Sequence, residues 1–179
     1  MLYSGHPTKD ARTGFRAFAM VREKHPDARL LMFGKTPPLV SLPVPSGASF
    51  TLLPPQEHIR DIYASCDVWL CSSSSEGFGL PVLEAMACRC PIVSTVVGGP
   101  LDLITEGVDG FLVPIGDAKA MADKANTILA MRDADWRKMS DAAYVRATSY
   151  GWNDAVERFE AALNEAAQGH EQAMFSAAA

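Results

Sequence analysis

Short apolar runs of strand length alternate along this chain with segments whose apolar residues repeat at helical spacing. The apolar runs lie at residues 1–4, 29–33, 49–53, 67–72, 91–96 and 110–113. Helical patterns lie at 13–25, 56–65, 80–88 and 98–104, and the chain is helical in pattern from Asp117 onward. Alternation of this kind is typical of βαβ units, whose parallel sheet is covered by helices on both faces. The sequence therefore predicts an α/β fold with a doubly wound parallel sheet.

The chain has the length of one domain. Its 179 residues are close to the ~150 of an average domain, and no linker or internal repeat interrupts them. We expect one folded domain over residues 1–168 and a frayed tail over 169–179, which lacks a packing pattern. The helix before that tail carries apolar residues at helical spacing, namely Trp152, Val156, Phe159 and Leu163.

Composition excludes several classes of protein. With 48% hydrophobic and 21% charged residues, the chain is neither disordered nor collagen-like. Its 21 acidic residues outnumber 16 basic ones, which form no stripe, and this argues against nucleic acid as a partner. No apolar run approaches the ~18 residues of a membrane span. The cysteines lack metal-type spacing and indicate free thiols in a reducing cytoplasm: Cys66, Cys71, Cys88 and Cys90.

Three patterns suggest chemistry but lack residues that the chemistry needs. The Gly-Lys-Thr at residues 34–36 resembles the end of a P-loop, yet Arg29 replaces the first glycine and prolines follow instead of a helix. Gly77 and Gly79 lie between a strand and a helix, as in dinucleotide-binding proteins, but Val82 replaces the third glycine. The four histidines form no metal-type pair, so no metal site is predicted.

Residues 72–87 carry the densest set of functional signals. Serines end a strand, glycines flank Phe78, and Pro81 occupies the first turn of a helix, where its missing N–H costs nothing. The free N–H groups and the positive dipole end of that helix favour a phosphate. Glu76 and Glu84 flank this position, and a carboxylate can accept hydrogen bonds from two neighbouring hydroxyls of a ribose or a hexose. The alternative is that Glu84 only favours the helix dipole and Glu76 is a solvated loop acid.

The same segment resembles a known family. Glu76 and Glu84, with Gly-Phe-Gly-Leu-Pro-Val-Leu-Glu-Ala-Met-Ala after Glu76, resemble the E-x7-E signature of retaining GT-B glycosyltransferases of the family 4 type. The similarity continues through residues 91–114 and, upstream, through 4–17 and 30–34. It implies a Rossmann-like fold, the single C-terminal lobe that binds the sugar donor in such enzymes.

The resemblance also implies roles for the matching residues. Glu76 would hold hydroxyls of the transferred sugar, and Glu84 would hold the ribose hydroxyls of the nucleoside-diphosphate sugar. Lys9 would neutralise the departing diphosphate, on which negative charge grows during transfer. The backbone of four residues would meet the sugar or the diphosphate: Gly77, Phe78, Gly79 and Leu80. Neither a metal ion nor another cofactor is expected, because in such enzymes a basic side chain and a helix end neutralise the diphosphate instead.

Some positions depart from the family pattern. Asp10 stands where a glycine usually follows the lysine, and glycine and histidine at residues 5–6 replace a companion arginine. The diphosphate site is therefore weaker than usual unless Arg12 compensates. Arg89 stands where a helix-ending glycine is common, so we expect a left-handed backbone there. Asp102 replaces a frequent glutamate.

The resemblance covers only half of an enzyme, since two such lobes need on the order of 300 residues. We expect a fragment or split-gene product that transfers nothing without an N-terminal, acceptor-binding lobe. That lobe would cover the last helix, whose apolar side chains would otherwise favour self-association, unless they pack on this lobe. The implied setting is polysaccharide biosynthesis in the cytoplasm, with the missing lobe peripheral to the inner membrane and a growing glycan or a lipid as acceptor.

Two other functions stay open. A non-catalytic nucleotide- or partner-binding module is supported by Asp10 and the missing arginine. An NAD-dependent oxidoreductase would require that Val82 is tolerated in place of the third glycine.

Overall fold

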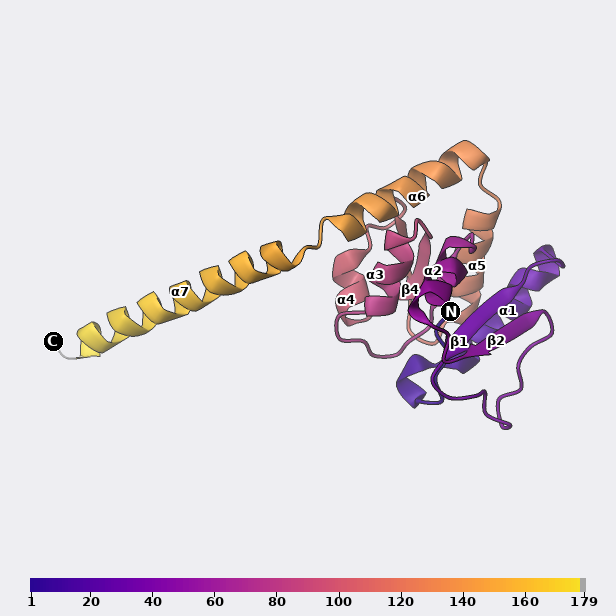
Figure 1. Ribbon diagram of the computed structural model, residues 1–179, viewed down its shortest axis with the longest axis horizontal. Coiled ribbons are helices and arrows are strands. Elements are labelled where there is room, and N and C mark those ends of the chain that lie inside the picture. Colours follow the sequence, from indigo (N-terminus) through magenta and orange to yellow (C-terminus); the bar gives the residue numbers. More distant parts are fainter. Residues whose placement is uncertain (178–179) are drawn as a thin grey trace. The chain divides into compact units, whose positions relative to one another are not determined.

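The computed structural model describes residues 1–177, with side chains throughout that range except at 152, 154 and 168–177. It divides into two compact units, Met1–Ala147 and the segment from Thr148 onward. The elements (Figure 1) are, in chain order, η1 (Pro7–Lys9), α1 (Ala11–Lys24), β1 (Leu30–Gly34), β2 (Ala48–Leu52), α2 (Gln56–Ala64), β3 (Trp69–Cys71), α3 (Leu80–Ala87), β4 (Ile92–Thr95), α4 (Gly98–Leu103), β5 (Gly110–Val113), α5 (Ala118–Leu129), α6 (Asp133–Thr148) and α7 (Trp152–Ala177).

All strand pairs in the described part of the chain are parallel. β1 pairs with β2, and β4 lies between β3 and β5. The N-terminal segment lies along β1, because Leu2 forms a parallel bridge with Phe33 and the N–H of Tyr3 donates to the Phe33 carbonyl at 2.8 Å. The run at residues 1–4 therefore pairs as expected, but only as an isolated bridge and not as a full strand.

Neighbouring residues of β3 and of β4 enter two different hydrophobic clusters. Leu70 and Val93 belong to a cluster with residues of α1 and α5, which pack against each other. Trp69 and Ile92 belong to a second cluster with residues of α2 and α3. Because side chains alternate between the faces of a sheet, helices cover both faces. The predicted α/β fold of parallel strands covered by helices is confirmed. The strands form two hydrogen-bonded sheets, β1–β2 and β3–β4–β5, where the sequence predicted one.

The last helix differs from the expectation. The first compact unit ends at Ala147, ahead of the boundary expected at residue 168. α7 continues to Ala177, so helix includes most of the segment that we expected to fray. Three apolar side chains of α7 are exposed: Val156, Phe159 and Leu163. The side chain of Trp152 lies outside the described part, and self-association through α7 stays a prediction.

The four cysteines are free. Cys71 and Cys90 are buried, and Cys66 and Cys88 are half-buried. Burial raises the pKa of the Cys66, Cys88 and Cys90 thiols, which keeps them protonated at neutral pH. Within residues 1–177, no helix combines the length and the hydrophobicity needed to cross a bilayer.

Candidate functional site

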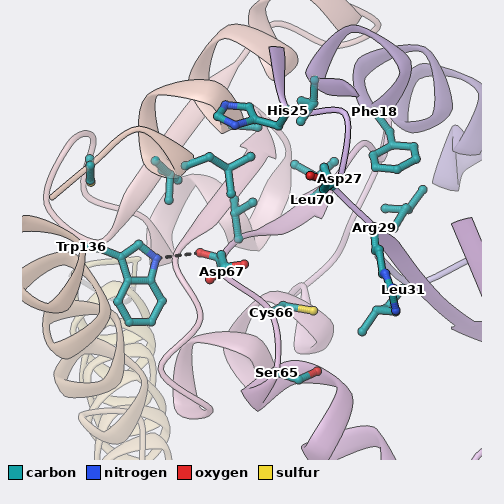
Figure 2. Close-up of a pocket in the computed structure, with 18 of the residues that line it drawn as sticks. Phe18, His25, Asp27, Arg29, Leu31, Ser65, Cys66, Asp67, Leu70 and Trp136 are labelled. Atoms are coloured by element: carbon teal, nitrogen blue, oxygen red, sulfur yellow. Dashed lines mark hydrogen bonds between the residues drawn. The ribbon is translucent and has the colours of Figure 1, made fainter. Parts of the chain in front are cut away.

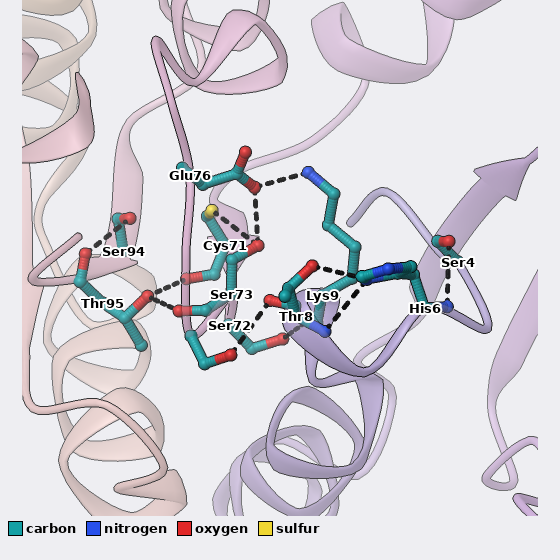
Figure 3. A network of polar contacts seen from close by, with 11 residues as sticks. Ser4, His6, Thr8, Lys9, Cys71, Ser72, Ser73, Glu76, Ser94 and Thr95 are labelled. Atoms are coloured by element: carbon teal, nitrogen blue, oxygen red, sulfur yellow. Dashed lines mark hydrogen bonds and ion pairs between the residues drawn. The ribbon is translucent and has the colours of Figure 1, made fainter. Parts of the chain in front are cut away.

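Lys9 and Glu76 form an ion pair beyond the carboxyl ends of the strands. Lys9 is the last residue of η1, and its Nζ lies 2.6 Å from Oε1 of Glu76. Ser73 donates a hydrogen bond to the same oxygen at 2.6 Å, and Figure 3 shows the three side chains converging. The Glu76 side chain is only 10% exposed and that of Lys9 is 24% exposed. Glu76 is therefore a partly buried, paired carboxylate and not a solvated loop acid.

Hydrogen bonds join the two loops that supply this pair. Ser72 donates from its hydroxyl to the carbonyl of Asp10 at 2.9 Å, and the N–H of Ser74 donates to the carbonyl of Thr8 at 2.7 Å. One loop follows the N-terminal segment and the other follows β3, so both leave the carboxyl edge of the parallel strands. That edge is where open α/β sheets bind their ligands.

Two glycines at the start of α4 allow it to pack directly on the loop that carries Glu76. A Cβ on Gly98 would lie 1.9 Å from the Glu76 carbonyl oxygen, and one on Gly99 would lie 1.8 Å from that of Phe78. The N–H of Gly99 donates to the Gly77 carbonyl at 2.6 Å. Any larger residue at these two positions would displace the loop, so the glycines fix the backbone between Glu76 and Gly79.

Glu84 has a different partner. It is an exposed residue of α3, and its Oε2 accepts a hydrogen bond from the Tyr63 hydroxyl at 2.9 Å. Tyr63 is 1% exposed, and its ring packs edge-on to Phe33 and against Trp69. Burial, and then the Glu84 charge, raise the pKa of the Tyr63 phenol, so it stays a hydrogen-bond donor.

The four residues predicted to meet the ligand through their backbone form the turn into α3. Gly79 has a φ of +80° and is the N-cap of the helix, where no side chain caps the first turn. Phe78 and Leu80 are 50% and 58% exposed. Gly77 has no heavy atom within 4 Å of a built Cβ apart from its neighbours. This turn therefore presents backbone and an apolar rim to the surface.

The structure accounts for two of the departures from the family pattern. Asp10 adopts a φ of +39°, a left-handed backbone that glycine adopts most easily. Its carboxylate caps α1, with Oδ1 accepting from the Thr13 N–H at 3.2 Å, and Oδ2 accepts from the Thr13 hydroxyl at 2.6 Å. The left-handed backbone expected at Arg89 is confirmed by its φ of +64°. Arg12 and Asp102 are exposed, and their contribution to ligand binding stays a prediction.

A cavity in the described part of the chain lies elsewhere. It has a volume of about 900 Å³ and is lined by Met1, among others. Arg29, just before β1, and Asp67, just before β3, also line it (Figure 2). The cavity therefore opens at the amino edge of the sheet, opposite to the Lys9–Glu76 pair. A second cavity of about 300 Å³ is lined by residues of β1, β2 and α2. Neither Glu76 nor Glu84 lines either cavity.

Sequence reasoning missed three residues that hold the two acids. Ser73 bonds Glu76 directly, and Thr95 donates from its buried hydroxyl to the Ser73 carbonyl. Tyr63 bonds Glu84 from another helix. The run of serines before Glu76 was a usable signal for Ser73, whereas only the packing of α2 beside α3 identifies Tyr63.

Lys9 and the partly buried Glu76 at this edge suit a ligand that carries both negative charge and hydroxyl groups. Comparison with known proteins identifies the family. The family model described as "Glycosyl transferases group 1" matches residues 2–131, more than half of the chain. The chain belongs to the glycosyltransferase group 1 family. The resemblance seen around Glu76 and Glu84 is thereby confirmed at the level of the family.

Curated relatives in this family are longer proteins. A D-inositol 3-phosphate glycosyltransferase of Mycolicibacterium vanbaalenii is 35% identical over 122 residues, which are 67% of this chain and 26% of the relative. An N-acetyl-alpha-D-glucosaminyl L-malate synthase of Bacillus anthracis is 40% identical over 74 residues, 41% of this chain and 19% of the relative. The chain thus spans about a quarter or less of the length of these two relatives.

Solved structures agree on the fold. The C-terminal domain of a group 1 protein, LpcC of Francisella tularensis, superposes with a TM-score of 0.71 at 23% identity and covers 83% of each chain. TarM of S. aureus gives a TM-score of 0.78 at 18% identity, over 88% of this chain and 33% of that one. HepE of Anabaena in complex with UDP-glucose gives 0.70 at 22% identity, over 83% and 43%. These likenesses confirm a Rossmann-like GT-B lobe.

Proposed function

We propose that this chain is the donor-binding half of a retaining glycosyltransferase, which moves a sugar from a nucleoside-diphosphate sugar to an acceptor such as a growing glycan or a lipid. The observation that carries the proposal is the meeting of the Lys9 ammonium and the Glu76 carboxylate, 2.6 Å apart, at the carboxyl edge of the sheet. Membership of the group 1 family supports the reaction class.

Each residue has one task in this proposal. Lys9 neutralises the diphosphate, Glu76 accepts hydrogen bonds from hydroxyls of the sugar, and Glu84 accepts them from the ribose. The backbone of residues 77–80 meets the diphosphate or the sugar, since the uncapped first turn of α3 favours an anion. No metal ion or other cofactor is needed, because the cation and the helix end balance the charge of the diphosphate.

The transfer step sets the electrostatic demand on the site. The bond between the anomeric carbon and the diphosphate oxygen breaks, and the acceptor oxygen bonds to the same face of that carbon. The acceptor's hydroxyl proton passes to the departing diphosphate, on which negative charge has grown. Lys9 stabilises that charge more strongly in the transition state than in the bound substrate, which lowers the barrier.

A second lobe completes the enzyme in this proposal. The chain spans 26% of the length of the inositol-phosphate relative, and Phe78 and Leu80 leave an apolar rim exposed beside the Lys9–Glu76 pair. An acceptor-binding lobe facing this rim supplies the other wall of the site. We therefore expect the isolated chain to bind a sugar nucleotide weakly and to transfer no sugar until that lobe is added.

Calorimetric titration with UDP-glucose, GDP-mannose and ADP-glucose tests the binding function. At least one of the three should bind the chain, and Glu84→Gln should weaken that binding about tenfold because hydrogen bonds from the ribose to a charged acceptor are lost. Glu23→Gln, which changes an exposed acid on α1, is the matched control and should bind like the unaltered chain. Binding of none of the three ligands, or an equal effect of both substitutions, would contradict the proposal.

A further inference from the structure

Lys9, the cation assigned to the diphosphate, already has an anionic partner in this structure. The Nζ of Lys9 lies 2.6 Å from Oε1 of Glu76, closer than most hydrogen bonds between charged groups. A diphosphate that takes Lys9 must therefore compete with Glu76. The affinity of any nucleotide then depends on what happens to the displaced carboxylate.

Glu76 is poorly placed to lose its partner. Its side chain is 10% exposed, so water can replace the lost ammonium only in part. Of the contacts described, the hydrogen bond from Ser73 remains. A partly buried carboxylate that loses a cation is destabilised strongly unless new donors reach it.

We propose that the Lys9–Glu76 pair makes the site select a sugar nucleotide over the corresponding nucleoside diphosphate. The hydroxyls of the sugar replace the ammonium as donors to Glu76, while the diphosphate replaces Glu76 as the partner of Lys9. A nucleoside diphosphate satisfies Lys9 but leaves Glu76 with the Ser73 hydroxyl as its one described donor. This inference rests on the proposed function and adds to it a role for the ion pair itself.

The same exchange favours release of the product. Once the sugar has left with the acceptor, the remaining diphosphate competes with Glu76 for Lys9 and gains nothing from the carboxylate. Reformation of the 2.6 Å pair then weakens the hold on the diphosphate. The loops need not move for this exchange, since the hydrogen bonds of Ser72 and Ser74 fix both backbones.

The test compares matched ligands on one protein. Calorimetry measures dissociation constants for three matched pairs: UDP and UDP-glucose, GDP and GDP-mannose, and ADP and ADP-glucose. The comparison uses the pair that binds to the unaltered chain. The unaltered chain should prefer the sugar nucleotide. Glu76→Gln frees Lys9, so it should tighten the bare diphosphate several-fold, weaken the sugar nucleotide, and lower the ratio of the two affinities by about tenfold or more.

Two controls separate the inference from simpler explanations. Glu84→Gln should weaken both members of a pair equally and leave the ratio unchanged, because both carry the same ribose. Thermal unfolding of Glu76→Gln confirms that the variant is folded. If Glu76→Gln leaves the ratio unchanged or weakens the bare diphosphate, the pair is only a structural contact and the inference is wrong. The sugar-binding role of Glu76 then falls with it, while donor binding by the chain, tested separately through Glu84→Gln, still stands. If none of the six nucleotides binds the unaltered chain, both are overturned.

Discussion

Tyr63 donates its phenolic hydrogen to Oε2 of Glu84 over 2.9 Å, so a side chain buried on α2 orients an acid on the surface of α3. Glu84 has a long side chain with several rotamers, and an exposed carboxylate in that position would lose conformational freedom when it binds a ligand. The Tyr63 hydroxyl removes part of that freedom in advance. The contact therefore predicts a contribution of Tyr63 to binding without any contact to the ligand.

Replacing Tyr63 with phenylalanine tests this role. Tyr63→Phe keeps the ring that packs on Phe33 and Trp69 and removes only the hydroxyl. Sugar-nucleotide affinity should fall by about 1 kcal/mol, roughly fivefold, in a calorimetric titration. Tyr3→Phe removes a hydroxyl that accepts from the Leu39 N–H at 2.9 Å, and it should not change the affinity. An equal effect of the two variants would contradict the orienting role.

The close packing of α4 on the Glu76–Gly79 loop gives a second prediction. In Gly99→Ala the added methyl would meet the Phe78 carbonyl oxygen at 1.8 Å, so the loop must move. We expect destabilisation by about 2 kcal/mol or more in urea unfolding, together with loss of sugar-nucleotide binding. Gly151→Ala meets no atom within 4 Å and serves as the control. Unchanged binding in Gly99→Ala would show that the position of the loop does not matter.

The left-handed residue at the end of α3 allows a comparison of two substitutions. Arg89 has a φ of +64°, pairs with Asp141 and lies 4.2 Å from the centre of the Tyr144 ring. Arg89→Gly and Arg89→Ala remove the same side-chain contacts, but only alanine keeps the strained backbone. Arg89→Gly should therefore be more stable than Arg89→Ala by about 1 kcal/mol in chemical unfolding. Equal stability would show that the strain is relieved elsewhere.

Asp109 gives a prediction on pH. It is buried, and burial raises the pKa of its carboxyl although the N–H of Thr105 donates to Oδ1 at 2.8 Å. The folded state therefore holds the proton more tightly than the unfolded state. The stability that Asp109 contributes is complete below its unfolded pKa and is lost as the pH rises through the folded pKa.

Asp109→Asn tests that dependence, since asparagine keeps an acceptor for Thr105 without a charge. The variant should be more stable than the unaltered chain at about pH 7.5, and the gain should shrink toward about pH 4 as Asp109 becomes protonated. Urea unfolding at both pH values measures this difference in the free energy of unfolding. A gain that is the same at both values, or a loss at the higher one, would contradict the assignment of the burial effect to Asp109.

The fold could be predicted from the sequence because burial sets the apolar pattern of most strands and helices. Strands buried on both faces read as apolar runs, as at Trp69–Cys71, and the helices between them are long enough to show their period. The sequence predicted less well the secondary structure of two segments at the ends of the chain. Residues 1–4 pair through one bridge, and α7 continues through residues 169–177, which carry no apolar repeat.

The candidate site could be predicted only in part. Glu76, Glu84 and Lys9 were named from motif and resemblance, but their partners come from elements far away in the sequence. Lys9 reaches Glu76 across 67 residues, and Tyr63 reaches Glu84 across 21. Such contacts depend on the packing of the loops after two strands and on the helix α2, which a local pattern does not encode.

The most direct test of the account is a crystal structure of the chain with the nucleotide sugar that binds most tightly in calorimetry. We predict that the Glu76 carboxylate lies within hydrogen-bond distance of hydroxyls on the sugar, that Glu84 lies within that distance of the ribose, and that Lys9 has turned from Glu76 to the diphosphate. A ligand in the cavity of about 900 Å³ at the opposite edge of the sheet, or one that touches neither acid, would contradict the account.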